Sequence, residues 1–212
     1  MKLHVHEWGE PDAPVVVCLH GVTGTGALFA GLAGWLTQFR VLAPDLRGHG
    51  RSTWEPPWRI DTHLEDLLET FDDIQPVAWV GHSFGGRLTI ELAARHPELV
   101  RRAVLLDPAI RLRPENALRA ADETQPSEQY GRSAAVAIFG ELATWGPPPE
   151  EIRAPTLLVL PLDETVVGPR QLARYERGVS DLRVVHVPGR HHVLVDSFEE
   201  TAAAIGEFLG TA

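Results

Sequence analysis

The 212-residue sequence lacks several features typical of extracellular and membrane proteins. Cys18 is its only cysteine, so no disulfide can form within the chain, and the surrounding apolar run VVVCL predicts a buried thiol. No apolar stretch approaches the roughly 20 residues that span a bilayer, and the first ten residues contain no apolar core of a signal peptide. We therefore expect a cytoplasmic protein with no membrane partner.

Positively charged side chains are outnumbered in this chain, which has a formal net charge of −10 at pH 7. The arginine-rich stretch RLR at 111–113 is short and has acidic neighbours. A nucleic-acid surface needs a clustered basic patch, so we expect no nucleic-acid partner.

The sequence also lacks the spacings that indicate a bound metal or nucleotide. It contains no H-E-x-x-H motif and no clustered Cys/His spacing, so we expect no metal, although His4 and His6 share one face of a predicted edge strand. The stretch GVTGTGALF at 21–29 resembles a dinucleotide fingerprint, but Phe29 replaces the third glycine and no phosphate-binding lysine follows. We expect no cofactor.

The regular structure that is present alternates between short apolar strands and amphipathic helices. The predicted strands are 2–8, 14–20, 39–45, 76–81, 100–107, 154–160 and 182–188, and the predicted helices are 30–38, 60–74, 86–97, 171–178 and 198–210. This alternation predicts an α/β fold with a mostly parallel, twisted sheet that has helices on both faces. We expect the first two strands to form a hairpin that supplies an antiparallel edge.

Residues 108–151 interrupt the alternation because no strand is predicted between Asp107 and Pro155. Helices are predicted near 114–122 and 133–145, and the prolines at 147–149 form a stiff spacer. We interpret 108–151 as a small helical cap inserted into a core made of 1–107 and 152–212.

The stretch WVGHSFGG at 79–86 stands where a predicted strand meets a predicted helix. It contains G-x-S-x-G, in which glycines permit a strained turn that exposes the Ser83 hydroxyl as a nucleophile. A serine needs a base and an orienting carboxylate to become reactive, and its reaction needs N–H donors for the oxyanion.

Residues of the required types follow other predicted strands. His191 and His192 follow the strand 182–188, and the carboxylates after earlier strands are Asp107, Asp163 and Glu164. The glycine-rich loop CLHGVTG at 18–24 follows the second strand, where a backbone N–H could face the serine.

Together these motifs resemble the serine hydrolases of the α/β-hydrolase superfamily across nearly the full chain. The resemblance rests on His20-Gly21 with its glycine-rich loop, DLRGHGRS (45–52), GHSFGG (81–86), APTLLVL (154–160) before an acid, and PGRHH (188–192) before the final helix. It implies that Ser83 is the nucleophile and that the backbone N–H groups of Phe84 and Val22 form the oxyanion hole.

The resemblance also implies roles for other polar residues in these motifs. Asp45 would organise the DLRGHGRS loop, and we expect His20, His49 and His82 to hydrogen-bond to loop backbones.

The base and the acid each have alternatives. Asp196 lies five positions after His191, as family sequences typically have it, whereas counting from Pro188 favours His192; we choose His191. For the acid, residue type favours Asp163, while Asp107 is supported by family members that carry the acid after the preceding strand. Glu164 is the third candidate, because the family register falls on it.

The expected function is cofactor-free hydrolysis of a small carboxylic ester or lactone through an acyl-enzyme. A serine at the turn argues against haloalkane dehalogenase and epoxide hydrolase chemistry, in which superfamily members use an aspartate. Carbon–carbon bond hydrolysis, perhydrolysis and acyl transfer share the same catalytic set, and a non-catalytic binding protein could retain the fold. Caps in the family often contain more helices than 108–151 can hold, so we expect a reduced cap and an open cleft above Ser83.

Overall fold

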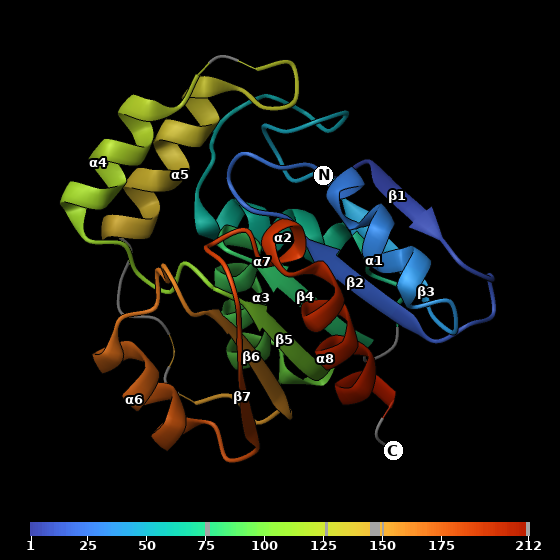
Figure 1. Ribbon diagram of the computed structural model, residues 1–212. Coiled ribbons are helices and arrows are strands. Elements are labelled where there is room, and N and C mark those ends of the chain that lie inside the picture. Colours follow the sequence, from blue (N-terminus) through green and yellow to red (C-terminus); the bar gives the residue numbers. More distant parts are fainter. Residues whose placement is uncertain (75–76, 126, 145–148, 150, 211–212) are drawn as a thin grey trace.

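A seven-stranded sheet forms the centre of the computed structural model, which describes residues 1–74, 77–125, 127–144, 149 and 151–210 (Figure 1). In chain order the strands are β1 (Val5–Trp8), β2 (Val15–Leu19), β3 (Arg40–Pro44), β4 (Val77–His82), β5 (Val100–Leu106), β6 (Thr156–Pro161) and β7 (Leu182–Val187). Their order across the sheet is β1-β3-β2-β4-β5-β6-β7, and every pair except β1 with β3 is parallel. The predicted mostly parallel sheet is confirmed.

The predicted hairpin between the first two strands is wrong. Strand β1 is an antiparallel edge, but its partner is β3, with Val5 opposite Pro44 and Trp8 opposite Val41. Strand β2 is apolar on both faces, and the sheet places it inside, between β3 and β4. A fully buried strand is stabilised by neighbours on both sides, which leaves the half-exposed β1 at the edge.

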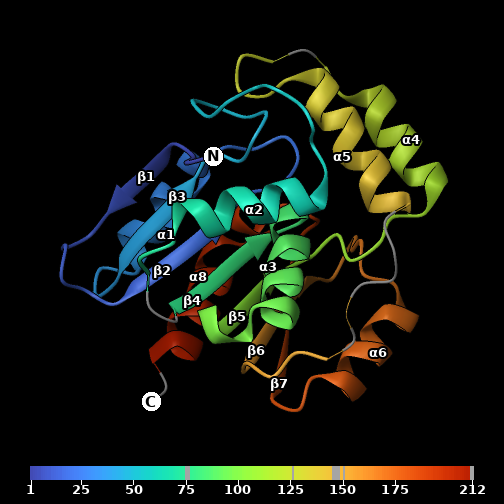
Figure 2. The ribbon, with the colours of Figure 1, turned by 180° about the vertical axis from the view of Figure 1, so that it is seen from behind.

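Helices cover both faces of the sheet, as the two ribbon views show (Figures 1 and 2). The helices outside the cap are α1 (Ala30–Trp35), α2 (Ile60–Thr70), α3 (Phe84–Arg95), α6 (Pro169–Gly178), α7 (Val193–Asp196) and α8 (Phe198–Gly210), with short 3₁₀ turns at Gly26–Phe29 and Pro97–Leu99. Alternate residues of β2 face opposite layers: Val17 packs with α2 and α3, and Cys18 packs with α1 and α8.

Cys18 is fully buried, as its sequence context predicts, and burial raises the pKa of its thiol well above the ordinary value.

None of the described helices has both the length and the apolar content that a membrane crossing requires.

The inserted segment contains two helices, α4 (Pro114–Glu123) and α5 (Arg132–Thr144), which pack against each other above the sheet (Figure 1). Both were expected from the sequence, whereas the proline spacer at 147–149 lies, apart from residue 149, outside the described residues. Backbone hydrogen bonds tie the segment to the loop after β3, from the Gly50 N–H to the Gln129 carbonyl at 2.7 Å and from the Gly131 N–H to the Gly48 carbonyl at 2.9 Å.

Candidate active site

Ser83 occupies a sharp turn between β4 and α3. Its φ of +53° and ψ of −113° lie outside the conformations that side-chain-bearing residues ordinarily adopt. The turn depends on glycine: a Cβ on Gly81 would lie 2.3 Å from the Gly85 carbonyl oxygen, and a Cβ on Gly85 would lie 2.1 Å from the Leu19 carbonyl oxygen. The backbone at Ser83 is therefore the strained strand-to-helix turn that the G-x-S-x-G motif predicts.

His191 lies beside Asp107, which directly follows β5 and is completely buried. The distance from His191 Nδ1 to Asp107 Oδ2 is 2.7 Å. The Thr165 hydroxyl donates to Asp107 Oδ1, and the Val166 N–H donates to Asp107 Oδ2 at 3.2 Å. A carboxylate oxygen accepts, so Nδ1 of His191 donates this hydrogen bond, and in the neutral imidazole Nε2 then carries the lone pair. An imidazole in this tautomer can act as a general base.

The other two candidate acids are exposed on the loop after β6. The Asp163 N–H donates to the Gly189 carbonyl at 3.0 Å, and among the described residues neither the Asp163 nor the Glu164 carboxylate bonds to a histidine. The loop instead presents Thr165 to Asp107. The structure thus brings Asp107 to the histidine, and places Asp163 and Glu164 elsewhere.

His192 lies next to His191 but makes different contacts. Its ring centroid is 5.4 Å from that of His191 and 5.5 Å from that of His82, and its carbonyl accepts the Val195 N–H. Partial burial and the neighbouring His191 lower the pKa of His192. In the described part of the chain no carboxylate bonds to the His192 ring, so the orienting contact belongs to His191.

Asp196, which sets the register of the histidines in the sequence, holds their loop. Its Oδ2 accepts the Arg190 N–H at 2.8 Å, and a Cβ on Gly189, whose φ is +87°, would lie 2.5 Å from the Asp196 Cβ. The spacing between Asp196 and His191 therefore reflects a hydrogen bond that shapes the turn immediately before His191.

Two backbone N–H groups lie next to Ser83. Phe84 is the first residue of α3, and the loop that carries Val22 passes close to Ser83, because a Cβ on Gly21 would lie 3.2 Å from the Ser83 Cβ. The Gly21 carbonyl accepts a hydrogen bond from His20 Nδ1 at 2.7 Å. The C=O and N–H of a trans peptide point in opposite directions, so the Val22 N–H of the same peptide points away from His20 Nδ1. Outside regular helices and strands, no hydrogen bond among the described residues uses the Val22 or Phe84 N–H.

Buried histidines hydrogen-bond to the loop backbones, as the sequence predicts. His20 Nε2 accepts the Leu46 N–H at 2.9 Å, and His49 Nε2 lies 2.5 Å from the Val22 carbonyl oxygen. Burial lowers the pKa of both imidazoles.

His82 also bonds to a loop backbone, as expected from the sequence. Burial lowers its pKa to about 3, and its Nε2 lies 2.8 Å from the carbonyl oxygen of His191. A neutral imidazole donates its Nε2 proton to that carbonyl, so the residue before Ser83 is bonded to the backbone of the histidine loop. Thr165 is a residue that sequence reasoning missed, because no motif marks a loop threonine that donates to Asp107.

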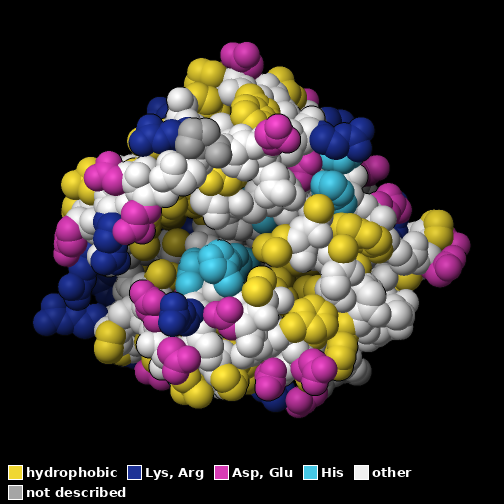
Figure 3. Space-filling model, turned by 45° about the horizontal axis from the view of Figure 1, so that its top comes forward, with side chains coloured by type: hydrophobic (Ala, Val, Ile, Leu, Met, Phe, Trp, Pro, Cys, Tyr) yellow, Lys and Arg dark blue, Asp and Glu magenta, His cyan; other side chains and the backbone are white. Residues whose placement is uncertain are grey.

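Ser83 and His191 open into one cavity of about 1440 Å³ between the sheet and the cap. Ser83 is only 8% exposed but lines this cavity together with Val22, and helices α4, α5 and α6 contribute the outer walls. Figure 3 shows histidine side chains at the centre of this face, in a hollow bordered by hydrophobic and charged side chains.

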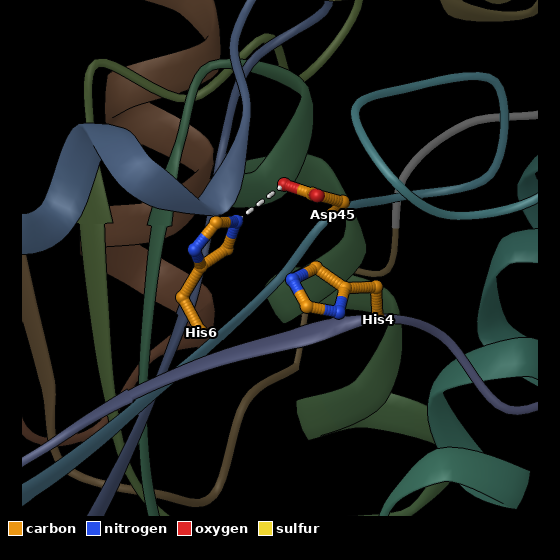
Figure 4. Close-up of side chains that lie close together, drawn as sticks. All are labelled: His4, His6 and Asp45. Atoms are coloured by element: carbon orange, nitrogen blue, oxygen red, sulfur yellow. Dashed lines mark hydrogen bonds and ion pairs between the residues drawn. The ribbon is translucent and has the colours of Figure 1, made fainter.

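A second cluster of polar side chains lies on the β1 edge, where His4 and His6 approach Asp45 (Figure 4). Their possible ligand atoms lie within 4.8 Å of one another, so these three residues could hold a metal. Asp45 is already hydrogen-bonded: it accepts from His6 Nε2 at 3.0 Å, from the Gly26 N–H at 2.8 Å and from the Arg51 N–H at 2.9 Å. These bonds give Asp45 the loop-organising role expected from the sequence.

Comparisons with known proteins agree on one family. The family model described as alpha/beta hydrolase fold matches residues 14–133. Lipase LipV of Mycobacterium tuberculosis is 40% identical over 61% of this chain and 51% of its own length. A pimeloyl-[acyl-carrier protein] methyl ester esterase of Methylococcus capsulatus is 37% identical over 44% of this chain and 36% of its own length. The matches thus span about half or less of these relatives.

Solved structures show the same architecture over nearly the whole chain. The crystal structure of the enol-lactonase from Burkholderia xenovorans superposes with a TM-score of 0.86 at 23% identity, covering 99% of this chain and 96% of that one.

Proposed function

Because the chain belongs to the alpha/beta hydrolase fold family, we propose that it is a serine hydrolase of carboxylic esters or lactones. The observation that carries the proposal is the 2.7 Å bond between His191 Nδ1 and Asp107, in the cavity that Ser83 also lines. Relatives named as a lipase and as a methyl ester esterase support an ester substrate.

In the proposed reaction, His191 Nε2 takes the Ser83 proton as Oγ attacks the ester carbonyl carbon. Asp107 stabilises the imidazolium that forms, and the Val22 and Phe84 N–H groups bind the oxyanion. The alcohol leaves with the proton from His191, and a water activated by the same imidazole then hydrolyses the acyl-enzyme. Each oxyanion donor in such sites typically contributes about 10²–10³ in kcat.

The turn at Ser83 suits this role because the protein's fold, rather than a flexible side chain, holds the oxygen in place. Burial of the surrounding glycines and the pairing of β4 with β2 and β5 fix the backbone on both sides of the serine. A fixed nucleophile lowers the entropy that must be lost when the transition state forms.

A short-chain para-nitrophenyl ester and a fluorophosphonate probe test the proposal. We expect the wild-type protein to hydrolyse the ester and to be labelled at Ser83, as read by mass spectrometry. In Ser83→Ala we expect labelling to disappear and kcat to fall by about 10⁶. Labelling at another residue, or a Ser83→Ala variant that keeps a tenth of the activity, would overturn the assignment.

A wider substrate panel separates the reactions that share this catalytic set. Esters of graded chain length, lactones and carbon–carbon bond substrates are compared, with hydrogen peroxide or an alcohol offered as an alternative to water. We expect esters and lactones with water as acceptor to give the highest kcat/KM.

A further inference from the structure

The wall of the catalytic cavity carries a charge opposite to that of the whole molecule. The chain has a net charge of −10, but the residues lining the cavity include five arginines and three carboxylates. The arginines are Arg111, Arg113, Arg119, Arg170 and Arg190, and the carboxylates are Glu123, Glu164 and Asp196. A positively charged cavity wall in an acidic protein suits a negatively charged ligand.

These arginines have no partner among the described residues. No ion pair and no side-chain hydrogen bond in that part of the chain engages any of the five guanidinium groups, and all five residues are exposed. Elsewhere in the described chain, Arg47 is paired with Asp66, Arg87 with Glu91, and Arg183 with Glu207. The cavity arginines are therefore available to a ligand.

The five side chains come from separate elements that surround the same space. Arg111 and Arg113 lie on the segment that leads into α4, Arg119 lies on α4, and Arg170 lies in the first turn of α6. Figure 1 shows α4 and α6 on the same side of the sheet, and Figure 3 shows basic side chains beside and below the central histidines. Arg190 directly precedes His191.

The acidic side chains do not cancel this charge. Three carboxylates stand against five guanidinium groups, so the formal charge of these eight side chains is +2; the bond from the Arg190 backbone N–H leaves the charge of Asp196 in place. Apolar side chains, including Leu112, Phe139 and Leu142, line the same cavity. A substrate with an apolar spacer between its ester and a remote anionic group would match both kinds of wall.

We propose that the natural substrate is an ester or lactone that carries a carboxylate group remote from the scissile bond. This rests on the proposed function, since the carboxylate is placed relative to Ser83. The guanidinium group presents a planar pair of N–H donors that matches a carboxylate, and it keeps its charge at every physiological pH. A cationic cleft also raises the rate at which an anionic substrate arrives.

Matched charged and neutral esters test the inference. The charged substrate is mono-para-nitrophenyl adipate, and its neutral partner is the methyl ester of the same compound. We expect the wild-type kcat/KM to favour the charged ester by about tenfold at low ionic strength, the sum of a few exposed ion pairs. High salt screens such pairs, so the preference should shrink towards unity.

A pair of double variants locates the effect. Arg119→Gln with Arg170→Gln removes two cavity arginines, and we expect the preference for the charged ester to fall to about threefold or less. The control is Arg101→Gln with Arg153→Gln, which makes the same change in net charge at exposed positions outside the cavity. We expect the control to keep both the wild-type rates and the preference.

The outcomes separate this inference from the proposed function. If both esters are hydrolysed through Ser83 without preference, or if the control variant loses the preference equally, the carboxylate class is wrong and the hydrolase assignment stands. If neither ester is hydrolysed and the phosphonate probe does not label Ser83, the proposed function fails and this inference fails with it.

Discussion

The two sides of the catalytic cleft are built in different ways. On the serine side, Gly81, Ser83 and Gly85 are buried, and the backbone passes so close to itself that a Cβ on either glycine would lie within 2.3 Å of a carbonyl oxygen. On the histidine side, the loops at 162–165 and 190–192 are mostly exposed, and the ring of His191 is oriented by one bond to Asp107.

This difference predicts that substitutions on the two sides affect stability and activity differently. On the serine side, the position of Ser83 depends on backbone packing, so changes there should disturb folding and activity together. On the histidine side, the orientation of the His191 ring depends on a side-chain hydrogen bond, so changes there should disturb activity alone. The following experiments test that division, in order of decreasing expected effect.

The largest effect on the histidine side is expected for His191→Ala. Without its general base the serine is unactivated, so kcat should fall by about 10⁶, as far as in Ser83→Ala, because the two residues act as one unit. The matched control is His192→Ala, for which we expect about a tenfold loss or less, since this ring touches no carboxylate in the described structure. Steady-state kinetics and a thermal melt would be measured on both.

The reverse ranking of these two variants would assign the general base to His192, and the bond between His191 and Asp107 would then have no part in the reaction. A large drop in melting temperature for His191→Ala would contradict the expected division between the two sides.

Asp107→Asn is expected to have the next largest effect. An amide at this position can favour the wrong imidazole tautomer, and the corresponding change in serine proteases lowers kcat by about 10⁴. Asp163→Asn and Glu164→Gln are the controls, and each should keep kcat within about threefold, because both carboxylates are exposed and away from the histidine. A loss in Asp163→Asn as large as in Asp107→Asn would transfer the acid to the loop after β6.

The serine side could be predicted from the sequence because its constraints are local. Gly81, Ser83 and Gly85 lie within a few positions of one another, and the close approaches that require glycine occur within that turn and against β2. The strands could be predicted for a similar reason: a buried strand is apolar in sequence, whichever segments of the chain pack against it.

The histidine side could be predicted only in part because its contacts join distant segments. Asp107 and His191 are separated by 84 positions, and the loop after β6 decides which side chain reaches Asp107. That side chain is Thr165, and the sequence carries no signal that would set it above the adjacent acids. The predicted partner of β1 was wrong for the same reason, because β1 pairs with β3, a strand that is not its neighbour in the sequence.

A test of the serine side is Gly85→Ala. The added Cβ would lie 2.1 Å from the Leu19 carbonyl oxygen, and neither backbone can move without disturbing the sheet. We expect the free energy of unfolding to fall by at least about 3 kcal/mol, measured by urea denaturation. Activity should fall with it.

Gly140→Ala is the matched control. Gly140 lies in α5 with nothing within 4 Å of the position its Cβ would take, so we expect this helix to gain about 0.5–1 kcal/mol. Equal stabilities for the two variants would show that backbone contact does not set the position of the turn at Ser83.

The smallest effect concerns pH and arises on the serine side, where the buried imidazoles gather. His63 packs edge-on against Phe84, with ring centroids 5.0 Å apart, and burial lowers its pKa to about 4; the pKa of His82 falls to about 3. The unfolded chain binds protons at these residues near pH 6.5, whereas the folded chain does not, so the unfolded state holds more protons below that pH. Stability is therefore full above about pH 7 and is lost as the pH falls towards 4.

Each such histidine contributes a slope of about 1.4 kcal/mol per pH unit between its two pKa values. We expect His63→Gln to lower the stability at pH 7 but to make its decline between pH 6 and pH 4.5 shallower by about that slope, as measured from urea midpoints. Leu64→Val, at the neighbouring buried position of α2, lowers stability without removing a titrating group, so its pH profile should stay parallel to that of the wild type. If His63→Gln also gives a parallel profile, the loss of stability in acid does not come from the buried imidazole that packs against the serine turn. The pH dependence would then not distinguish the serine side from the histidine side.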